Sequence, residues 1–214
     1  MKPEPLKILI ADDHALLRRG LMQLLSDELP HVKFGEAENS QQALDLIWNQ
    51  SWSLVVLDIN MPGRNGFEVL EEVTRKKPAM PVLVLSAFPE DQLGLRALQA
   101  GAAGYVTKQS ANESLVEAIK KVMAGGRFIS PTLAEAMADH LRRPADGELH
   151  NALSSREFQV MQMLVTGRTI KEIALELSLS AKTVSTFRRR LLKKLRLEGN
   201  ADLVRYALLH RLTD

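Results

Sequence analysis

The chain has 214 residues, of which 45% are hydrophobic and 25% charged, and this supplies enough apolar side chains for one large or two modest folded domains. It contains no cysteine, which excludes disulfides, zinc sites built on thiolates and cysteine nucleophiles. The formal net charge of +2 conceals an asymmetry, because residues 1–125 carry 13 basic and 16 acidic side chains (−3) and residues 126–214 carry 15 and 10 (+5).

The N-terminal residues carry charge and two prolines where a signal peptide needs an apolar run. No stretch of the sequence is apolar over the length that a membrane-spanning helix requires. We therefore expect a soluble, cytoplasmic protein that has no membrane partner.

Short apolar runs alternate with amphipathic segments through the first half of the chain. The expected strands cover residues 6–11, 32–37, 54–58, 82–87 and 105–107. The expected helices cover residues 15–25, 41–48, 67–75, 92–100 and 113–123. Continuous apolar runs such as Leu54 to Leu57 are typical of strands that helices cover on both faces of a parallel sheet. The pattern predicts an α/β domain of (βα)5 order with a doubly wound parallel sheet.

Beyond these helices the sequence indicates a connecting region. Gly125 and Gly126 are suited to end a helix, and residues 131–141 form a further expected helix with Pro131 in its first turn. Residues 142–151, which include Pro144, Asp146 and Gly147, lack apolar periodicity and are expected to be a linker. We place a first domain at residues 1–126, a linker helix and linker at 127–151, and a second domain at 152–214.

The second domain is expected to be small and all-helical, with four helices bounded by explicit start and stop signals. Two residue pairs have the spacing of a capping box, one glycine is suited to a helix end, and two further residues are expected N-caps. In chain order these are Ser154 with Glu157, Gly167, Thr169 with Glu172, Ser180 and Asn200.

Polar residues lie at the carboxyl ends of the expected strands, at the sheet edge where ligands bind in open α/β folds. They are Asp12, Asp13, Asp58, Ser86 and Lys108. Phosphoryl transfer needs mainly positioning and charge neutralisation, for which a carboxylate nucleophile, carboxylate ligands for a hard divalent cation, a hydroxyl and an ammonium group are suited. Each residue alone is more simply explained as a helix N-terminal acid, a turn residue or a solvated side chain. Their occurrence together at strand ends favours a phosphoryl site.

These residues resemble the receiver domain of two-component response regulators over roughly residues 6–124. The similarity rests on Ile10-Ala11-Asp12-Asp13-His14, Leu57-Asp58-Ile59-Asn60-Met61-Pro62-Gly63, Ser86-Ala87 and Lys108. The resemblance implies a flavodoxin-like fold, Mg²⁺ as cofactor and a loop at residues 61–66 that shapes the acceptor side. The roles it implies are phosphoacceptor for Asp58, phosphoryl contacts for Ser86 and Lys108, a switch for Tyr105, and Mg²⁺ ligation for Asp12, Asp13, Asp58 and the backbone carbonyl of Asn60.

Three residues near this site allow a second interpretation. Tyr105 also suits ordinary core packing, and a lone histidine such as His14 is more often a loop or packing residue than a metal ligand. Gln109 stands where receivers commonly have proline after the lysine, and a cis peptide bond costs a non-proline residue about 3 to 4 kcal/mol. The resemblance therefore does not fix the geometry of the loop after Lys108.

Basic residues of the second domain gather on one expected helix. Residues 171–177 and 181–197 have helical character and flank a turn at 178–180, which is the arrangement of a helix-turn-helix. From Ala181 to Arg196 there are seven basic residues and no acidic one, whereas a merely solvated face normally mixes both signs. The opposite side of this helix carries the apolar residues Val184, Phe187, Leu191 and Leu195. This core-like side and the lack of aromatic stacking residues favour DNA over RNA or an anionic membrane.

Residues 152–212 resemble the LuxR-type helix-turn-helix of NarL/FixJ-class regulators. The similarity rests on Leu153-Ser154-Ser155-Arg156-Glu157, Gly167, Ile170-Lys171-Glu172-Ile173-Ala174, Leu177, Leu179-Ser180, Thr183-Val184 and Leu192-Lys193-Lys194-Leu195. It implies double-stranded DNA as a partner, and a final helix at residues 201–209 that resembles a dimerisation helix but also suits a core. Ser185 departs from the lysine common at its position, so no base preference is inherited. The residues it places toward DNA are Lys182, Thr183, Ser185, Thr186 and Arg189, with Arg188 and Lys193 near phosphates.

These features predict a transcription factor, not an enzyme, that accepts a phosphoryl group on Asp58 from a sensor histidine kinase and binds DNA, as a homodimer when active. Two other functions remain open. A magnesium-dependent phosphohydrolase would turn over external phosphate esters, but the sequence reveals no groups for repeated turnover. A constitutive regulator would use the first domain only as a dimerisation scaffold, and the intact set of polar strand-end residues argues against that function.

Overall fold

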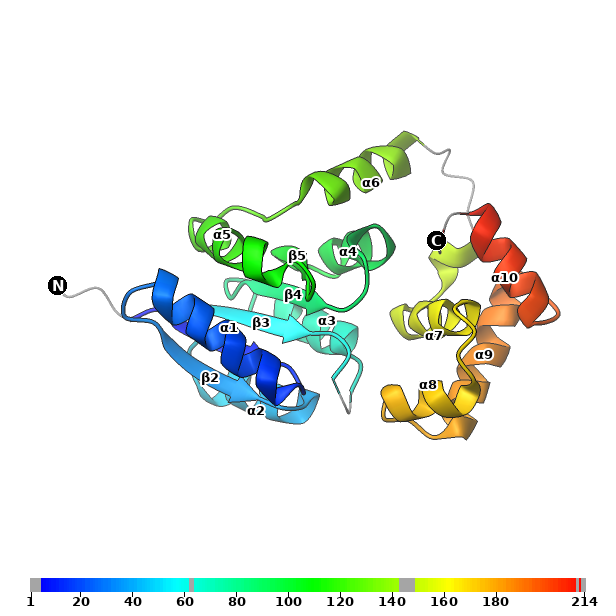
Figure 1. The fold of residues 1–214 in the computed structure, drawn as a ribbon, viewed down its shortest axis with the longest axis horizontal. Helices are drawn as coiled ribbons and strands as arrows, with labels where there is room; N and C mark the ends of the chain where they lie inside the picture. The colour runs from blue at the N-terminus through cyan, green and yellow to red at the C-terminus, as the bar shows by residue number, and fades with distance from the viewer. Residues whose placement is uncertain (1–4, 62–63, 143–148, 211, 213–214) are drawn as a thin grey trace. The chain divides into compact units, whose positions relative to one another are not determined.

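The chain divides into two compact units, Met1–Leu141 and Arg142–Asp214, in a computed structural model that describes residues 5–61, 64–142, 149–210 and 212 (Figure 1). The first unit is α/β and the second is helical, which confirms the fold class expected from the sequence. Within these described ranges, no helix combines the length and the apolar character needed to span a bilayer.

The first unit alternates strands with helices in (βα)5 order. Its strands are β1 (Lys7–Ala11), β2 (Lys33–Ala37), β3 (Leu54–Asp58), β4 (Val82–Ser86) and β5 (Gly104–Thr107). Its helices are α1 (Ala15–Glu28), α2 (Ser40–Asn49), α3 (Gly66–Lys76), α4 (Glu90–Gln99) and α5 (Ala111–Met123), followed by α6 (Pro131–Arg142). Pro131 therefore occupies the first position of its helix, where a missing backbone N–H costs nothing.

The five strands form one parallel sheet in the order β2-β1-β3-β4-β5. The chain moves outward from β1 to β2 and then returns to β3, so the order reverses between β1 and β3. Side chains at the carboxyl ends of these two strands border the crevice where open α/β sheets bind ligands. The topology therefore brings the residues that follow β1 and β3 to one place.

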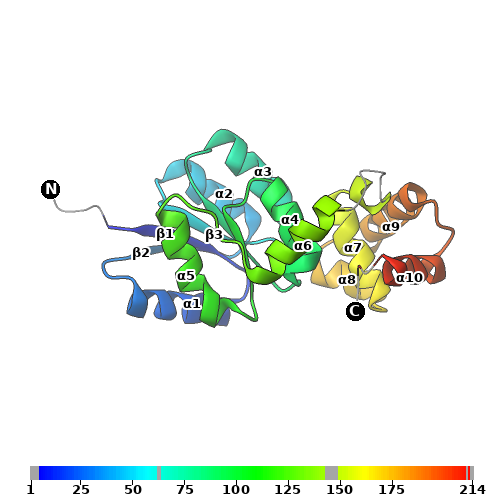
Figure 2. The ribbon, with the colours of Figure 1, turned by 90° about the horizontal axis from the view of Figure 1, so that it is seen from above.

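Helices cover both faces of the sheet, with α1 and α5 on one side and α2 and α3 on the other (Figure 2). Every residue of β3 and β4 is buried, as the continuous apolar runs predicted. Between the sheet and the α1–α5 layer lies a cluster of buried aliphatic side chains that includes Leu21, Ile10, Leu85 and Leu115. This core fixes the ends of the strands that carry the polar residues.

The segment after α5 returns to the sheet edge. Phe128 pairs with Gly104 in a parallel bridge, and its N–H donates to the carbonyl of Ala103 at 2.9 Å. A β-carbon on Gly104 would lie 2.8 Å from both Cβ and O of Phe128, so only glycine permits this approach. The start of α6 belongs to the same unit, and its Leu133 is fully buried there.

The second unit contains a 3-10 helix η1 (Leu149–Ala152) and helices α7 (Ser155–Val165), α8 (Ile170–Glu176), α9 (Ala181–Leu195) and α10 (Asn200–Leu209). Ser154 with Glu157 and Thr169 with Glu172 form the two expected capping boxes, with both bonds present in each. Gly167 follows the end of α7 with φ 84°, a left-handed conformation that favours glycine.

One N-cap differs from expectation. Ser180 caps α9 as predicted, because its side chain accepts from the N–H of Thr183. Gly199, not Asn200, is the N-cap of α10, and Asn200 is already the first helical residue. The reason is that the Asn200 side chain accepts a hydrogen bond from Arg188 instead of capping its own helix.

Two observations concern the connecting region. The linker residues Pro144, Asp146 and Gly147 lie outside the described residues. The short helix η1 was not expected, because four residues are too few to show a helical periodicity.

Candidate functional site

Four groups that can bind a cation converge where β1 and β3 end. Asp12 follows β1 directly and Asp58 is the last residue of β3, and both side chains are fully buried. Asp13 and His14 are exposed beside them. One ligand atom from each of the four residues lies within 4.8 Å of the others. The structure thus brings the three predicted carboxylates together and places beside them His14, which was interpreted from the sequence as a loop or packing residue.

Lys108 joins the two buried carboxylates. It follows β5, and its own N–H is held by the carbonyl of Ser86 at 2.7 Å. Its Nζ lies 2.7 Å from Oδ2 of Asp58 and 2.7 Å from Oδ2 of Asp12. One ammonium group therefore offsets part of the charge of two acids that the fold buries side by side.

Burial dominates the ionisation of this cluster. It raises the pKa of Asp58 to about 6, against the opposing effect of the Lys108 ammonium, and the nearby Asp12 charge raises it further. Burial lowers the pKa of Lys108, but the attraction of Asp58 and Asp12 outweighs it, so that this pKa is raised overall. At neutral pH the site therefore holds an ionised Asp58 beside a charged Lys108.

The acidic groups suit a hard divalent cation. Oδ1 of Asp58 accepts from the N–H of Asn60 at 2.8 Å, and Oδ1 of Asp12 accepts from the N–H of His14 at 2.7 Å. Oδ2 of Asp12 is buried and receives no hydrogen bond from the described residues, and its close contact with Lys108 is an ion pair without hydrogen-bond angles. A buried carboxylate oxygen in this state, with two further carboxylates within reach, fits an oxygen-binding ion such as Mg²⁺.

Ser86 and Tyr105 both contact the loop between β4 and α4. Ser86 is fully buried, and its Oγ accepts from the N–H of Phe88 at 3.2 Å. Tyr105 is also fully buried, and its hydroxyl donates to the carbonyl of Phe88 at 2.8 Å. Burial raises the pKa of Tyr105, so the phenol remains protonated and can donate. Through Phe88 the two predicted residues are linked to one loop.

Gln109 does not disturb the loop that carries Lys108. The described residues contain no cis peptide bond. The turn is held by Thr107, whose Oγ1 lies 2.8 Å from Oγ of Ser110 and accepts from the Ser110 N–H at 3.1 Å. These local bonds hold the backbone after β5 without a proline.

Arg18 is a site residue that the sequence analysis missed. It lies on α1 with its side chain buried, and its Nη1 donates to the carbonyl of Asp12 at 2.7 Å. Its Nε and Nη2 pair with Glu36 and Glu38 at 3.1 and 2.8 Å. The available signal was position, because Arg18 shares the i, i+3, i+7 spacing of the buried Leu21 and Leu25.

A second candidate site lies on α9 of the helical unit. In the turn between α8 and α9, Ser178 has a φ of 52°, and the N–H of Leu179 donates to the carbonyl of Ala174 at 2.8 Å. Val184, Leu191 and Leu195 are buried and hold one side of α9 to the unit. This is the geometry of a helix-turn-helix whose second helix exposes its other side.

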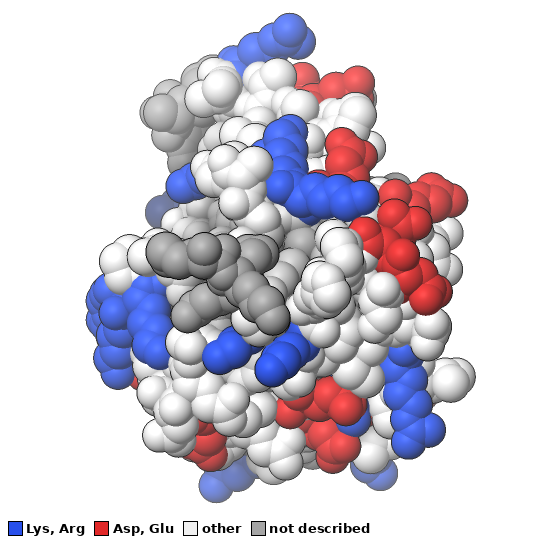
Figure 3. Space-filling view, turned by 90° about the vertical axis from the view of Figure 1, so that its left-hand side faces the viewer, with Lys and Arg blue, Asp and Glu red and all other residues white. Residues whose placement is uncertain are grey.

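The exposed side of α9 forms a basic hollow of about 700 Å³. Its lining includes six of the seven residues predicted to face DNA, and the seventh, Thr183, instead helps to cap the helix through Ser180. The six are Lys182, Ser185, Thr186, Arg188, Arg189 and Lys193. One acidic residue, Glu198, also lines the hollow, beside four basic ones. The face of the molecule in Figure 3 carries basic and acidic side chains next to one another.

The side chains that line the hollow differ in whether they are already hydrogen-bonded within the protein. Arg188 donates from Nε to Oδ1 of Asn200 at 2.7 Å, and the Thr186 hydroxyl donates to the carbonyl of Lys182 at 2.9 Å. Among the described residues, the side chains of Arg189 and Lys193 have no hydrogen bond or ion pair, and both are exposed. Arg188 is therefore tied to α10, whereas Arg189 and Lys193 are available to a ligand.

Two protein families match the two units. Residues 8–120 match the response regulator receiver domain, and residues 151–207 match the bacterial regulatory proteins of the luxR family. The response regulator GacA of Pseudomonas aeruginosa is 35% identical over 210 residues, covering 98% of each chain. The response regulator UvrY of Escherichia coli K12 is 34% identical over 208 residues, covering 97% of this chain and 95% of UvrY.

Solved structures agree at the level of the fold. RcsB of Salmonella enterica serovar Typhimurium, bound to promoter rprA in the presence of the phosphomimetic BeF3⁻, has a TM-score of 0.64 at 24% identity and covers 95% of this chain and 98% of its own. A LuxR-family response regulator from Aurantimonas has a TM-score of 0.60 at 30% identity and covers 65% of this chain and all of its own.

The fold, the acidic crevice and the basic helix define a receiver joined to a DNA-binding domain. The chain belongs to the two-component response regulators of the NarL/FixJ class, which combine a receiver with a LuxR-type helix-turn-helix. Its function is that of a phosphorylation-linked, DNA-binding transcription factor.

Proposed function

We propose that Asp58 is the phosphoacceptor of this response regulator. An oxygen of its carboxylate attacks the phosphorus of a phosphohistidine on a sensor histidine kinase, the phosphorus–nitrogen bond breaks with its electron pair returning to the histidine, and an acyl phosphate forms on Asp58. The observation that carries this proposal is the fully buried Asp58 carboxylate with the Lys108 ammonium 2.7 Å from its Oδ2. Because the pKa of Asp58 is about 6, the nucleophilic form predominates at pH 7.

The surrounding residues have distinct parts in this reaction. Lys108 lies between two carboxylates, so it can exchange one of them for a phosphoryl oxygen without leaving its place. Ser86 supplies a hydroxyl, and movement of its loop is transmitted to Tyr105 through Phe88. Bound Mg²⁺ would neutralise the charge on the phosphoryl oxygens. The residues that would hold it are Asp12, Asp13, Asp58 and the backbone carbonyl of Asn60.

Replacement of Asp58 tests this assignment. Incubation with acetyl phosphate and MgCl₂ should add one phosphoryl group to the wild-type chain, as read by intact-mass spectrometry, and none to Asp58→Ala. Asp45→Ala, which removes an exposed carboxylate on α2, should label like the wild type. Labelling of Asp58→Ala would refute the proposal, and hydrolysis of more than one p-nitrophenyl phosphate per chain would favour a phosphohydrolase instead.

We further propose that α9 binds the major groove of double-stranded DNA. The exposed basic side of α9 is suited to phosphates, and its short polar residue Ser185 and its long Arg189 are suited to base edges. On α10, Leu208 and Leu209 are exposed, and we propose that they pair two copies into the active homodimer. We assign the receiver to residues 1–126, the linker helix and linker to 127–151 and DNA binding to 152–214, and we place its action in the cytoplasm with the DNA.

Salt dependence distinguishes a phosphate contact on α9 from a solvated charge. Lys193→Ala should weaken binding to a labelled random-sequence duplex, measured by fluorescence anisotropy, and should reduce the slope of log K against log salt by about 0.9. Arg190→Ala removes the same charge from an exposed residue outside the hollow and should change the slope less. Equal slopes for both variants would contradict the assigned DNA face.

A further inference from the structure

Arg18 is buried where a charged side chain needs a specific reason. Its guanidinium makes three polar contacts with three different residues, and each of its nitrogens has one partner. Arginine is almost never fully buried unless it is paired, because removing its charge from water is costly. The burial of Arg18 therefore indicates a functional role as well as a structural one.

One of these three contacts reaches the main chain of Asp12. The Asp12 N–H donates to the carbonyl of Ala37 at 3.0 Å, and its carbonyl accepts from Nη1 of Arg18 at 2.7 Å. The peptide groups on both sides of this residue are thus held by neighbouring elements, β2 on one side and α1 on the other. Because the carboxylate of Asp12 extends from this fixed main chain, its position depends on Arg18.

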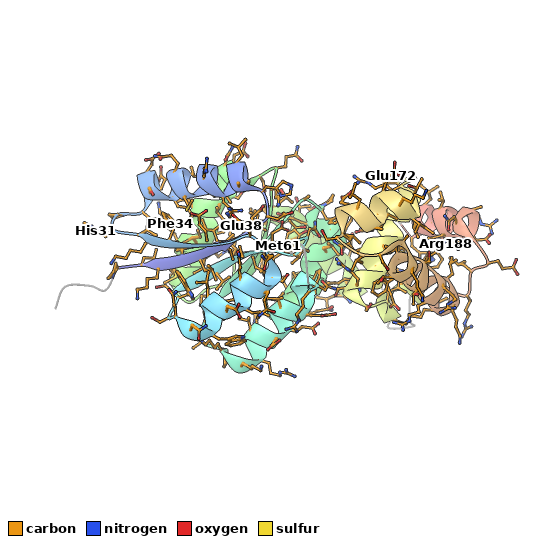
Figure 4. The ribbon with its side chains drawn as sticks, turned by 90° about the horizontal axis from the view of Figure 1, so that it is seen from below. His31, Phe34, Glu38, Met61, Glu172 and Arg188 are labelled. Atoms are coloured by element: carbon orange, nitrogen blue, oxygen red, sulfur yellow. The ribbon has the colours of Figure 1, made fainter. Side chains whose placement is uncertain are left out.

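Electrostatics alone would make Arg18 unfavourable for a cation site. A guanidinium next to an acidic cluster repels a divalent cation. Two carboxylates that pair with the other nitrogens of Arg18 offset that charge. They belong to Glu36 and Glu38, whose side chains are about half exposed at 46% and 63%. Figure 4 shows Glu38 and Met61 toward the same end of the sheet, opposite His31.

We propose that Arg18 is a positioning residue for the divalent cation of the receiver. It fixes the main chain at Asp12 so that the carboxylates of Asp12 and Asp13 are aimed before the cation binds, and Glu36 and Glu38 neutralise the charge that this role brings into the site. Residues that orient metal ligands in this way typically change metal affinity by 10- to 100-fold when they are replaced. The inference rests on the proposed cation site.

The proposal is tested by whether replacing Arg18 lowers or raises the affinity for a divalent cation. Free Mn²⁺ is measured by electron paramagnetic resonance while the full-length protein is titrated, so no phosphoryl donor is needed. Arg18→Met, which keeps most of the side-chain length, should lower Mn²⁺ affinity by about 10-fold. If Arg18 acted only through its charge, the affinity would rise, and if it served only stability, the folded variant would bind with unchanged affinity. Either of these results would overturn the proposal.

Two further variants complete the test. Arg19→Met, the exposed neighbour on α1, is the matched control and should leave the affinity unchanged. Glu36→Gln/Glu38→Gln leaves Arg18 uncompensated and should also weaken binding, but with a loss that added salt reduces, since it arises from charge. An increase in affinity for this double variant would contradict the neutralising role.

The remaining outcomes separate this inference from the proposed function. If Arg18→Met is recovered unfolded, Arg18→Lys carries the test, because it keeps the charge, loses the planar fork and should still bind Mn²⁺ more weakly. A wild-type chain that binds no Mn²⁺ and takes no phosphoryl group would overturn both proposals. A wild type that does both, beside an Arg18→Lys variant of wild-type affinity, would overturn only the role of Arg18.

Discussion

Asp58, the proposed nucleophile, has a fully buried carboxylate, and the burial of this charge costs free energy. Its ordinary pKa is 3.8, and burial raises it to about 6 despite the Lys108 ammonium. The folded chain therefore holds a proton on this residue more tightly than the unfolded chain does. Between these two pH values, raising the pH removes stability from the fold, because the folded state then binds more protons than the unfolded state. The cost is fully present above about pH 6.

Asp58→Asn should therefore stabilise the first unit at neutral pH. The difference between 3.8 and about 6, which already includes the opposing attraction of Lys108, corresponds to at most about 3 kcal/mol. Urea unfolding of the full chain in EDTA, followed by tryptophan fluorescence, is the measurement, since both tryptophans, Trp48 and Trp52, lie in the first unit. The gain should be largest at pH 7.5 and vanish near pH 4. A gain that is independent of pH would contradict this account.

The site residues that lie at strand ends were predictable from the sequence. Asp12, Asp58 and Lys108 were predicted to converge because parallel strands end at one edge, and the structure places them in contact. Arg18 was missed, because an arginine on an amphipathic helix usually lies on the solvated side. Its burial depends on Glu36 and Glu38, which lie 18 and 20 residues away in the sequence.

At the level of elements, Gly66 controls how α3 follows β3. A β-carbon on Gly66 would lie 2.3 Å from the Cα of Ile59, which is a backbone atom and cannot move without shifting the segment that follows Asp58. The segment between them resembles the loop that shapes the acceptor side of receivers, and its residues Pro62 and Gly63 lie outside the described ranges. The close approach makes glycine necessary at this position.

We expect Gly66→Ala to destabilise the first unit by about 1 to 3 kcal/mol, the usual cost of forcing an extra methyl group into a packed site. Gly20→Ala is the matched control, because nothing lies within 4 Å of its β-carbon on α1, and it should raise stability by up to about 1 kcal/mol. The same urea titration with tryptophan fluorescence measures both. If the two variants were equally stable, the contact between Gly66 and Ile59 would not limit this loop.

Elements were predictable where a periodicity or a cap spans several residues. All five strands, the helices from α1 to α6 and both capping boxes were expected from the sequence. The N-cap of α10 was placed one residue late, because asparagine is intrinsically the better cap and only the contact with Arg188 gives Asn200 another role. Tertiary contacts of this kind cannot be predicted from the local sequence.

At the level of the whole molecule, the charge asymmetry separates two chemical tasks. The first unit gathers carboxylates around a candidate cation and phosphoryl site, and the second exposes a basic helix. Each unit buries its own set of apolar side chains. In the function proposed above, the protein acts as a regulator because phosphorylation of Asp58 changes the occupancy of DNA by α9.

The most direct test of this coupling is genomic footprinting with the full-length chain, with and without acetyl phosphate and MgCl₂. The wild type should occupy its sites more fully when the phosphoryl donor is present, whereas Asp58→Asn, which retains the fold and the basic face of α9, should give the same occupancy in both conditions. Equal occupancy for the wild type with and without the donor, in samples shown by mass spectrometry to be phosphorylated, would contradict the account and identify a constitutive regulator.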